Sequence, residues 1–350
     1  MRKTIYILIL AFLVSCTKEG GSAGKLMEFS VSTPGVVSTK AEATLDGLKG
    51  TGSAVYVYGT KSDGSNSLSV FDAPGTALLT NDSSTGMWKP SGKDYNWSDD
   101  MYYQFYGYAY GSDVNTNNLT IPNETYGRQF TVTQPETGDG SNTIDYLLSY
   151  MVNIPPTTNH PLVPIRLEHA MAKVEVDVQI AGAMYDNTEC LVDNINISVS
   201  GIKRKATMLC VQPKLDGEEG TNTWQVTFED NAGTATYTNE TISNTKEDNL
   251  SGTNAVAPDM SFIAVPVTNE QMGDYMLKLS YHGTITDTYY EYTFNLKDFS
   301  PKGWVNGHKV RYILTIDNSI HLAGSIVDYE DVDYIEAVIV PGQENNVQNP

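Results

Sequence analysis

Cysteine, histidine and basic side chains are scarce in this 350-residue chain, and each scarcity excludes a class of protein. Three cysteines are too few for a disulfide-stapled scaffold, and none stands in a C-x-x-C pair that would hold zinc. The five histidines lack the H-x-x-x-H spacing of a helical metal site. Only 22 Lys and Arg face 42 Asp and Glu, and the resulting net charge of −20 repels nucleic acid and anionic lipid.

Catalytic signatures are missing as well. The chain contains no G-x-S-x-G element, P-loop or GxGxxG context, and nothing singles out a catalytic pair among its many carboxylates. The acids between Asp328 and Asp333 offer oxygen ligands of the kind that Ca²⁺ takes, but no EF-hand loop surrounds them, so a solvated acidic turn is favoured. We therefore expect no enzyme, no cofactor and no metal site.

Long apolar runs are absent except at the amino terminus. Met1-Arg2-Lys3 precedes an apolar run from Ile5 to Val14, which is too short to span a bilayer and is typical of a secretory signal peptide. Leu13-Val14-Ser15-Cys16 resembles the lipobox of bacterial lipoproteins, which implies a signal peptide over residues 1–16 and lipidation of Cys16. A cysteine placed there by accident is the alternative.

Abundant tyrosine, glycine and alternating apolar residues indicate an all-β chain. The central stretch 162–180 alternates through Val163, Ile165 and Leu167, and again from Val174 to Ile180, as half-buried strands do. Three prolines between residues 153 and 161 predict a linker just before it. We expect one domain over residues 41–161 and a second over residues 162–350, the latter an antiparallel sandwich.

Tyrosines crowd one predicted strand, residues 101–110. A tyrosine buries a large apolar ring and keeps a polar hydroxyl, so such a ladder suits either packing between sheets or an exposed platform for sugar rings. We favour packing.

Two cysteines, Cys190 and Cys210, flank an alternating segment with a turn expected near Ser200-Gly201. A hairpin folding there would bring the two thiols opposite each other and allow a disulfide, since secretion places them in an oxidising compartment. Two buried thiols acting as small apolar residues are the alternative.

Near the amino terminus, residues 20–24 read as a flexible tether, and residues 26–31 as a short strand. The following segment, residues 36–43, lacks apolar bulk and contains Lys40, so it predicts an exposed loop that a protease would cut.

Several elements together resemble the fimbrillin-like family, the lipoprotein pilins of Bacteroidales-type pili. They are H-A-x-A-K-V-x-V from His169, the aromatic strand at residues 101–110, I-D-Y-L from Ile144, and W-x-x-G-x-x-x-x-Y from Trp304. The resemblance implies two transthyretin-like β-sandwich domains in tandem. It also implies a structural pilus subunit at the outer membrane and cell surface, contributing to adhesion.

The same resemblance implies how the subunit is assembled. A trypsin-like Arg/Lys protease would cut after Lys40, leaving Ala41 as the new amino terminus and removing the tether and first strand, residues 17–40. Lys25 and Lys49 compete as cleavage sites. The candidate donor strand, residues 335–340, would then fill the groove of another pilin subunit through Ile335, Ala337, Val338, Ile339 and Val340.

Two alternatives stay open. Residues 335–340 also read as an ordinary edge strand, and the chain also reads as a non-polymerising surface lipoprotein that binds glycans. In either case the partners would include the outer membrane, through the lipid anchor, and ligands on host or bacterial surfaces.

Overall fold

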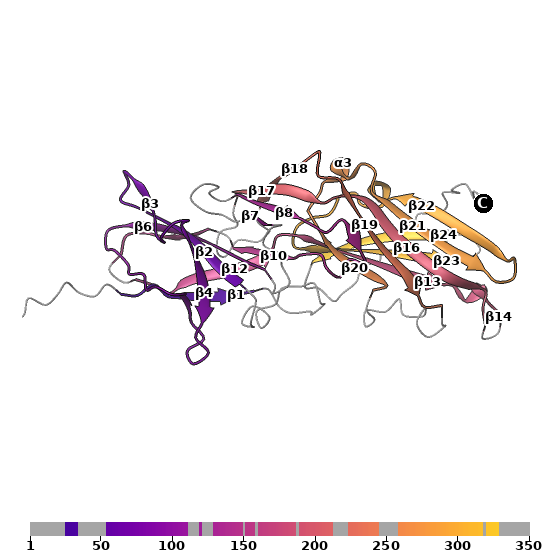
Figure 1. Cartoon of the computed structure of the whole chain (residues 1–350), viewed down its shortest axis with the longest axis horizontal. Helices are drawn as coiled ribbons and strands as arrows, with labels where there is room; N and C mark the ends of the chain where they lie inside the picture. Colours follow the sequence, from indigo (N-terminus) through magenta and orange to yellow (C-terminus); the bar gives the residue numbers. More distant parts are fainter. Residues whose placement is uncertain are drawn as a thin grey trace, which may run out of the picture.

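A computed structural model describes residues 25–33, 54–110, 119–120, 129–149, 151–157, 160–186, 189–212, 223–244, 258–317 and 320–328. The described part of the chain is almost entirely β-structure (Figure 1), in agreement with the expected fold class. Within it, no helix is long and apolar enough to cross a membrane.

The first half of the chain contributes the strands β1 (Phe29–Ser32), β2 (Ala54–Ser62), β3 (Ser67–Ser69), β4 (Thr76–Asn81), β5 (Trp88–Pro90), β6 (Tyr102–Tyr110), β7 (Leu119–Thr120), β8 (Gln129–Thr133), β9 (Thr137–Gly138), β10 (Tyr146–Ser149), β11 (Val152–Ile154) and β12 (Val163–His169).

The second half contributes β13 (Ala172–Ile180), β14 (Tyr185–Asp186), β15 (Glu189–Cys190), β16 (Val192–Lys203), β17 (Lys205–Gln212), β18 (Thr223–Phe228), β19 (Thr234–Ile242), β20 (Met260–Ala264), β21 (Met276–Gly283), β22 (Thr288–Asn295), β23 (His308–Ile316) and β24 (Ile320–Asp328). Its short helices are η2 (Gly182–Met184), α3 (Asn269–Met272) and η3 (Leu296–Phe299).

A closed, barrel-like sheet forms the amino-terminal end of the molecule, at the left of Figure 1. Its strands run in the order β6-β10-β12-β1-β5-β4-β2, and β2 pairs again with β6 along its whole length, from Ala54↔Tyr110 to Ser62↔Tyr102. The strands β11 and β3 extend this sheet to nine. The ring closes because β6 uses both of its edges, one for β2 and the other for β10 and β11. The family resemblance implies a sandwich of two open sheets for this half, and the closed ring differs from that expectation.

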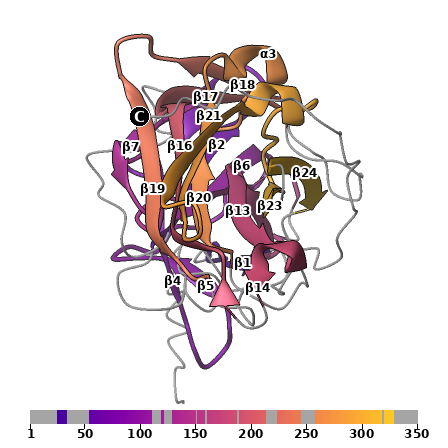
Figure 2. The ribbon, with the colours of Figure 1, turned by 90° about the vertical axis from the view of Figure 1, so that its right-hand side faces the viewer.

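Two sheets face each other in the second half. One has the order β20-β13-β23-β24 and the other β22-β21-β16-β19-β9. In Figure 2, β19 and β16 of the second sheet lie at the left, and β13, β23 and β24 of the first lie at the right. Between them lies a core of aliphatic and aromatic side chains, among them Val176, Ile197, Leu279 and Leu314, each nearly inaccessible to solvent. The half is therefore a sandwich of two sheets, but β13 and β23 pair in parallel, so it is not the purely antiparallel sandwich that the sequence predicts.

The two halves share a sheet and a core. The strand β8 pairs with β17 from Lys205↔Thr133 to Leu209↔Gln129, in a four-stranded sheet with the order β18-β17-β8-β7. Under it, Phe130, Val132 and Tyr146 pack with Met208 and Ile263 of the second half. The expected boundary between residues 161 and 162 therefore does not separate the sheets: β12 belongs to the barrel, whereas β8 and β9 join the second half.

The two strands predicted within the central stretch 162–180 are confirmed. Its first part is β12, inside the barrel, and its second part is β13, in the sandwich, with a break at Ala170-Met171. Their inward side chains, such as Leu167 and Val174, are fully buried. The outward acids of β13 depart from expectation, because Glu175 and Asp177 are buried as well.

The tyrosine ladder is confirmed as packing. On β6, Tyr103 and Phe105 point into the barrel, and the opposite face places Tyr106, Tyr108 and Tyr110 in buried positions. Tyr108 stacks on Tyr56 with ring centroids 5.1 Å apart. These rings lie against the core shared by both halves, and their buried faces are not accessible for a sugar ring to stack on.

The hairpin expected between the two cysteines is wrong. The strand β16 pairs with β19 and β21, and β17 pairs with β8 and β18, so the two strands enter different sheets. Cys190 is a free thiol. The sandwich recruits β16 as its central strand because Val192, Ile195, Ile197 and Val199 fill its core, which a local hairpin with β17 would leave empty.

Candidate functional site

The strand β1 and the groove that holds it form the first candidate site. We call this groove the seat of β1; β12, Trp88, the segment 95–97 and Phe105 surround it. The segment from Lys25 to Ser32 alternates, so that Met27, Phe29 and Val31 turn into the barrel, with 3%, 0% and 8% of their surface exposed. Leu26 on the opposite face is 39% exposed. The period of two in the sequence therefore decides which side chains fill the seat.

Backbone hydrogen bonds hold this segment on both edges. On one side β1 runs parallel to β12, from Phe29↔Val163 to Ser32↔Arg166. On the other side the amide of Met27 donates to the carbonyl of Tyr95 at 2.8 Å, the amide of Trp97 donates to the carbonyl of Lys25 at 3.0 Å, and Phe29 pairs with Trp88. The segment is thus an interior member of the ring, although only four of its residues form the strand proper.

Aromatic rings build the deepest part of the seat. The ring of Phe29 meets that of Phe105 edge-on, with centroids 5.6 Å apart, and Trp97 also contacts Phe105 edge-on at 6.0 Å. At the rim, the Lys89 ammonium lies 3.2 Å from the Glu28 carboxylate, with both side chains partly exposed. The ammonium of Lys25 donates to the carbonyl of His160.

Most of the site residues proposed from the sequence lie outside the described residues. These are the lipidation residue Cys16, the cleavage residues Lys40 and Ala41, the competing site Lys49, and the donor strand of residues 335–340. They stay predictions. Lys25 is described, and its backbone is part of the paired segment.

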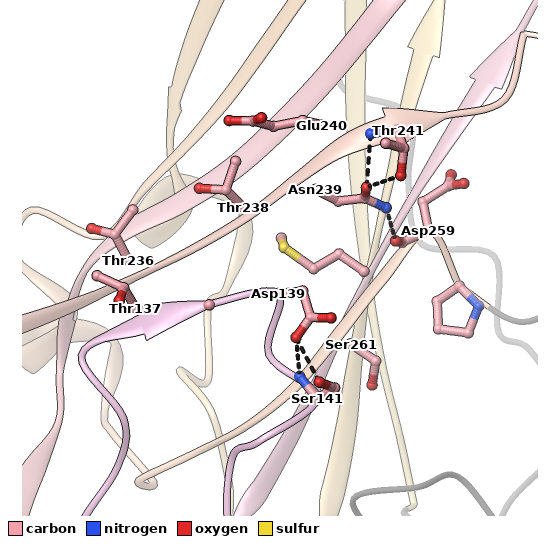
Figure 3. Close-up of a pocket in the computed structure, with 13 residues that line it drawn as sticks. Thr137, Asp139, Ser141, Thr236, Thr238, Asn239, Glu240, Thr241, Asp259 and Ser261 are labelled. Atoms are coloured by element: carbon pink, nitrogen blue, oxygen red, sulfur yellow. Dashed lines mark hydrogen bonds between the residues drawn. The ribbon is translucent and has the colours of Figure 1, made fainter.

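A second candidate is a polar hollow of about 740 Å³ beside the sandwich, between β19, the edge strand β20 and the turn that follows β9 (Figure 3). Threonines and serines dominate its lining, together with Asp139, Glu240 and Asp259, and none of the described residues that line it is aromatic or basic.

Much of the hydrogen-bonding capacity of this hollow is already used within the lining. The carboxylate of Asp139 accepts bonds from the hydroxyl and the amide of Ser141, at 2.6 and 3.0 Å, and these bonds lower its pKa. The Asn239 side chain donates to the carbonyl of Asp259 and accepts from the amide of Thr241 (Figure 3). Within the described residues, no group of three or more His, Cys, Asp or Glu side chains is arranged to hold a metal ion.

His169 has a structural setting. Its Nδ1 lies 2.7 Å from a carboxylate oxygen of Asp145, and both side chains are buried where β12 ends. The strands β10 and β12 meet there through the pair Leu147↔His169. The pair lies at the junction of the two halves, where β12 ends and β13 is about to begin.

Exposed aromatic side chains do not gather into a platform in the described part of the chain. Tyr102 is 55% exposed on β6, and Tyr289 is 58% exposed on β22. These strands belong to the barrel and to the sandwich, at opposite ends of the molecule (Figure 1).

Comparisons with known proteins agree with this architecture. A family model described as fimbrillin-like matches residues 39–328. No curated protein matches the chain.

Solved structures to which the chain is similar share little sequence with it. A fimbrial protein from Bacteroides vulgatus is 16% identical, with a TM-score of 0.53, over 86% of this chain and 99% of that one. A candidate cell adhesion protein from Bacteroides uniformis is 15% identical, with a TM-score of 0.48, over 87% and 99% of the two chains. A fimbrial assembly protein from Parabacteroides distasonis is 12% identical, with a TM-score of 0.39, over 91% and 100%.

Proposed function

Because this chain belongs to the fimbrillin-like family, we propose that it is a fimbrial subunit of the cell surface that joins its neighbour through the seat of β1. It is exported as a lipoprotein anchored in the outer membrane through Cys16. A trypsin-like protease then cuts after Lys40 and frees residues 17–40, and a strand from another subunit takes the vacated place. In this scheme the barrel and the sandwich are the two tandem modules of the subunit.

One observation carries this proposal: β1 is an interior strand of a closed sheet, yet it is short and lies close to the amino terminus. Its removal would open the ring between β12 and β5 and expose a row of unpaired backbone groups. Such an edge is a template for strand addition. A subunit that contacts a different surface of the next one forms an open fibre, because the contact does not close on itself.

The energetics favour replacement over an empty seat. Met27, Phe29 and Val31 are almost wholly buried, and burial of such side chains stabilises by roughly 1.5–3 kcal/mol each, so together by roughly 5–9 kcal/mol. A vacated seat would lose this contribution along with the ladder hydrogen bonds. An incoming strand restores both, less the entropy cost of association.

Among the competing cleavage sites, Lys25 is disfavoured in the folded chain. Its carbonyl accepts a hydrogen bond from Trp97 within the paired segment, and proteases prefer exposed, unpaired segments. Lys40 and Lys49 stay the candidates.

A disulfide lock tests the release of β1. Leu26 and Asn96 face each other as an antiparallel bridge, flanked by the hydrogen bonds Met27 to Tyr95 and Trp97 to Lys25. Such a non-hydrogen-bonded pair has Cα atoms about 4.5 Å apart, within reach of a disulfide. The variant Leu26→Cys/Asn96→Cys, made in a chain lacking residues 1–16, therefore ties β1 to the barrel.

After cleavage by a trypsin-like protease, we expect the parent chain to start at Ala41 by mass spectrometry and to form an SDS-resistant ladder on unboiled gels. The oxidised double variant should be cut but remain monomeric, and dithiothreitol should restore the ladder. The single variant Leu26→Cys is the control and should behave as the parent. A parent chain that is cleaved and stays monomeric would contradict the proposal, as would a ladder from the oxidised lock.

The glycan-binding alternative gains no support from the described residues. It needs an exposed aromatic platform, and the exposed tyrosines of the described part lie on separate strands in separate sheets.

A further inference from the structure

The seat of β1 is most completely buried at its centre. Phe29 is the middle of the three inward residues, has no exposed surface and meets Phe105 edge-on. Met27 and Val31, on either side, retain slight exposure. A replacing strand must therefore present a large aromatic side chain at the centre and an aliphatic one two residues away in each direction, if it is to leave no void.

The rim adds a second condition. Glu28, next to the central position, pairs with Lys89 at 3.2 Å. An acid at this point of the replacing strand keeps that pairing. The pattern that fits the seat is therefore aliphatic, acid, aromatic, any residue, aliphatic, as in Met27-Glu28-Phe29-Ser30-Val31.

The tail of this same chain matches the pattern everywhere except at the centre. The sequence Ile335-Glu336-Ala337-Val338-Ile339 places isoleucines at both flanks and the acid at the rim, but alanine at the centre. A methyl group would stand where the Phe29 ring stands, so Phe105 and its neighbours would face a void.

Shifting the register of the tail does not repair this mismatch. With Ile339 at the centre, Pro341 enters the sheet, and with Tyr334 at the centre, Glu336 turns into the barrel. A buried acid without a partner and a proline inside a sheet are both strongly disfavoured. The other registers from residue 332 to residue 342 place an acid inside or leave only a valine at the centre.

From this mismatch we infer that the seat of β1 accepts a strand from a different subunit, one with an aromatic residue at its centre, and discriminates against the tail of an identical copy. The inference rests on the proposed release of β1. The central pocket beside Phe105 is the specificity determinant, and Ala337 makes the tail of an identical copy the weaker occupant, so that this chain by itself forms only a short ladder. In the fibre the subunit then stands preferentially next to a chain of another sequence.

Three synthetic strands test the inference on the full chain lacking residues 1–16, after cleavage by a trypsin-like protease. The first peptide is residues 333–341 of this chain, the second carries Ala337→Phe, and the third carries Val338→Phe, which adds the same ring on the opposite face. Each carries a fluorophore, and binding is followed by anisotropy. Mass spectrometry records whether residues 17–40 leave.

We expect the Ala337→Phe peptide to bind about 100-fold more tightly than the unchanged one, since a Phe-to-Ala change in a core costs at least that much. The Val338→Phe peptide should show no gain. Equal binding of the first two peptides, or an equal gain for the third, would overturn the inference and leave the proposed function intact. If no peptide binds and residues 17–40 stay in place, the seat does not open, and both fail.

The corresponding change in the chain itself gives a second readout. After cleavage, the variant Ala337→Phe should form a longer SDS-resistant ladder than the parent, and Ala337→Ser should not. An unchanged ladder for Ala337→Phe would contradict the inference.

Discussion

At the residue scale, the outer face of β13 carries buried charges. Lys173, Glu175 and Asp177 are each less than 10% exposed. Lys173 pairs with Glu175 at 3.1 Å, and Arg311 of the neighbouring β23 donates to Asp177. Buried ion pairs are costly to desolvate, so such a cluster contributes less to stability than its contacts suggest.

The carboxyl of Asp177 shows this cost. Burial raises its pKa to about 6, outweighing the opposing effect of Arg311, and the negative charges of Asp259 and Glu175 add to the rise. The folded state therefore binds a proton that the unfolded state has already released between about pH 4 and pH 6. In that window the contribution of this group to the free energy of unfolding falls as pH rises.

Removal of the titrating group should flatten this dependence. Between pH 4 and pH 6.5, the parent chain should lose up to about 3 kcal/mol of stability relative to the variant Asp177→Asn, from a shift of about two pKa units. Urea unfolding at several pH values measures the difference. Asp230→Asn removes a carboxylate from an exposed position and serves as control. Parallel profiles for the parent and Asp177→Asn would rule out a raised pKa.

At the scale of elements, the barrel is narrow enough that two of its strands nearly touch across its interior. Gly107 of β6 faces Ile165 of β12, and a Cβ atom added to the glycine would lie 2.2 Å from the Ile165 methyl carbon. The backbone of Gly107 is also held in place, because its amide donates a hydrogen bond to the Ser149 hydroxyl at 2.7 Å. A side chain at this point must displace β12, and because β12 pairs with β1, the seat of β1 would be displaced as well.

The variant Gly107→Ala should therefore lower the free energy of unfolding by roughly 1–3 kcal/mol, the usual cost of overpacking a core. Denaturant unfolding followed by circular dichroism measures it. Gly182→Ala is the matched control, because its added Cβ would meet nothing within 4 Å. Equal effects of the two variants would mean that the close approach does not limit the barrel.

At the scale of the whole molecule, the two halves are built to act as one body. The β8–β17 ladder, the shared core around Phe130 and Met208, and buried hydrogen bonds join them. Among those bonds, the Ile263 amide of the second half donates to the Thr143 hydroxyl of the first half at 2.7 Å. In the proposed fibre, an elongated molecule joined in this way (Figure 1) would transmit force from one described half to the other without a hinge between them.

Such a junction predicts a single unfolding transition. Fluorotryptophan NMR separates the barrel, through Trp88 and Trp97, from the sandwich, through Trp304. Both sets of resonances should disappear at the same urea concentration, and Phe130→Ala should lower that midpoint for both by removing about 3–5 kcal/mol. The exposed substitution Ile285→Ala is the control. Two separate midpoints in the parent chain would show that the halves unfold independently.

The sequence by itself determined the local elements. Alternation located β12 through Val163 to Leu167 and β13 through Val174 to Ile180, to within two residues of their observed ends, because the period of two follows directly from the pleat of a strand. The sequence also predicted a short strand over residues 26–31, which is observed as β1. The family resemblance, carried by the order of several loose motifs, anticipated the fimbrillin-like match.

Only the tertiary structure decided which strands became neighbours. Alternation states that one face of a strand is buried, but it does not state which strand lies beside it. Hence the sequence missed the closure of the barrel through β6, the placement of β8 against β17, and the separation of β16 from β17. The same limit applies to the seat of β1: its alternation was readable, whereas the aromatic pocket that receives Phe29 is assembled from strands distant in the chain.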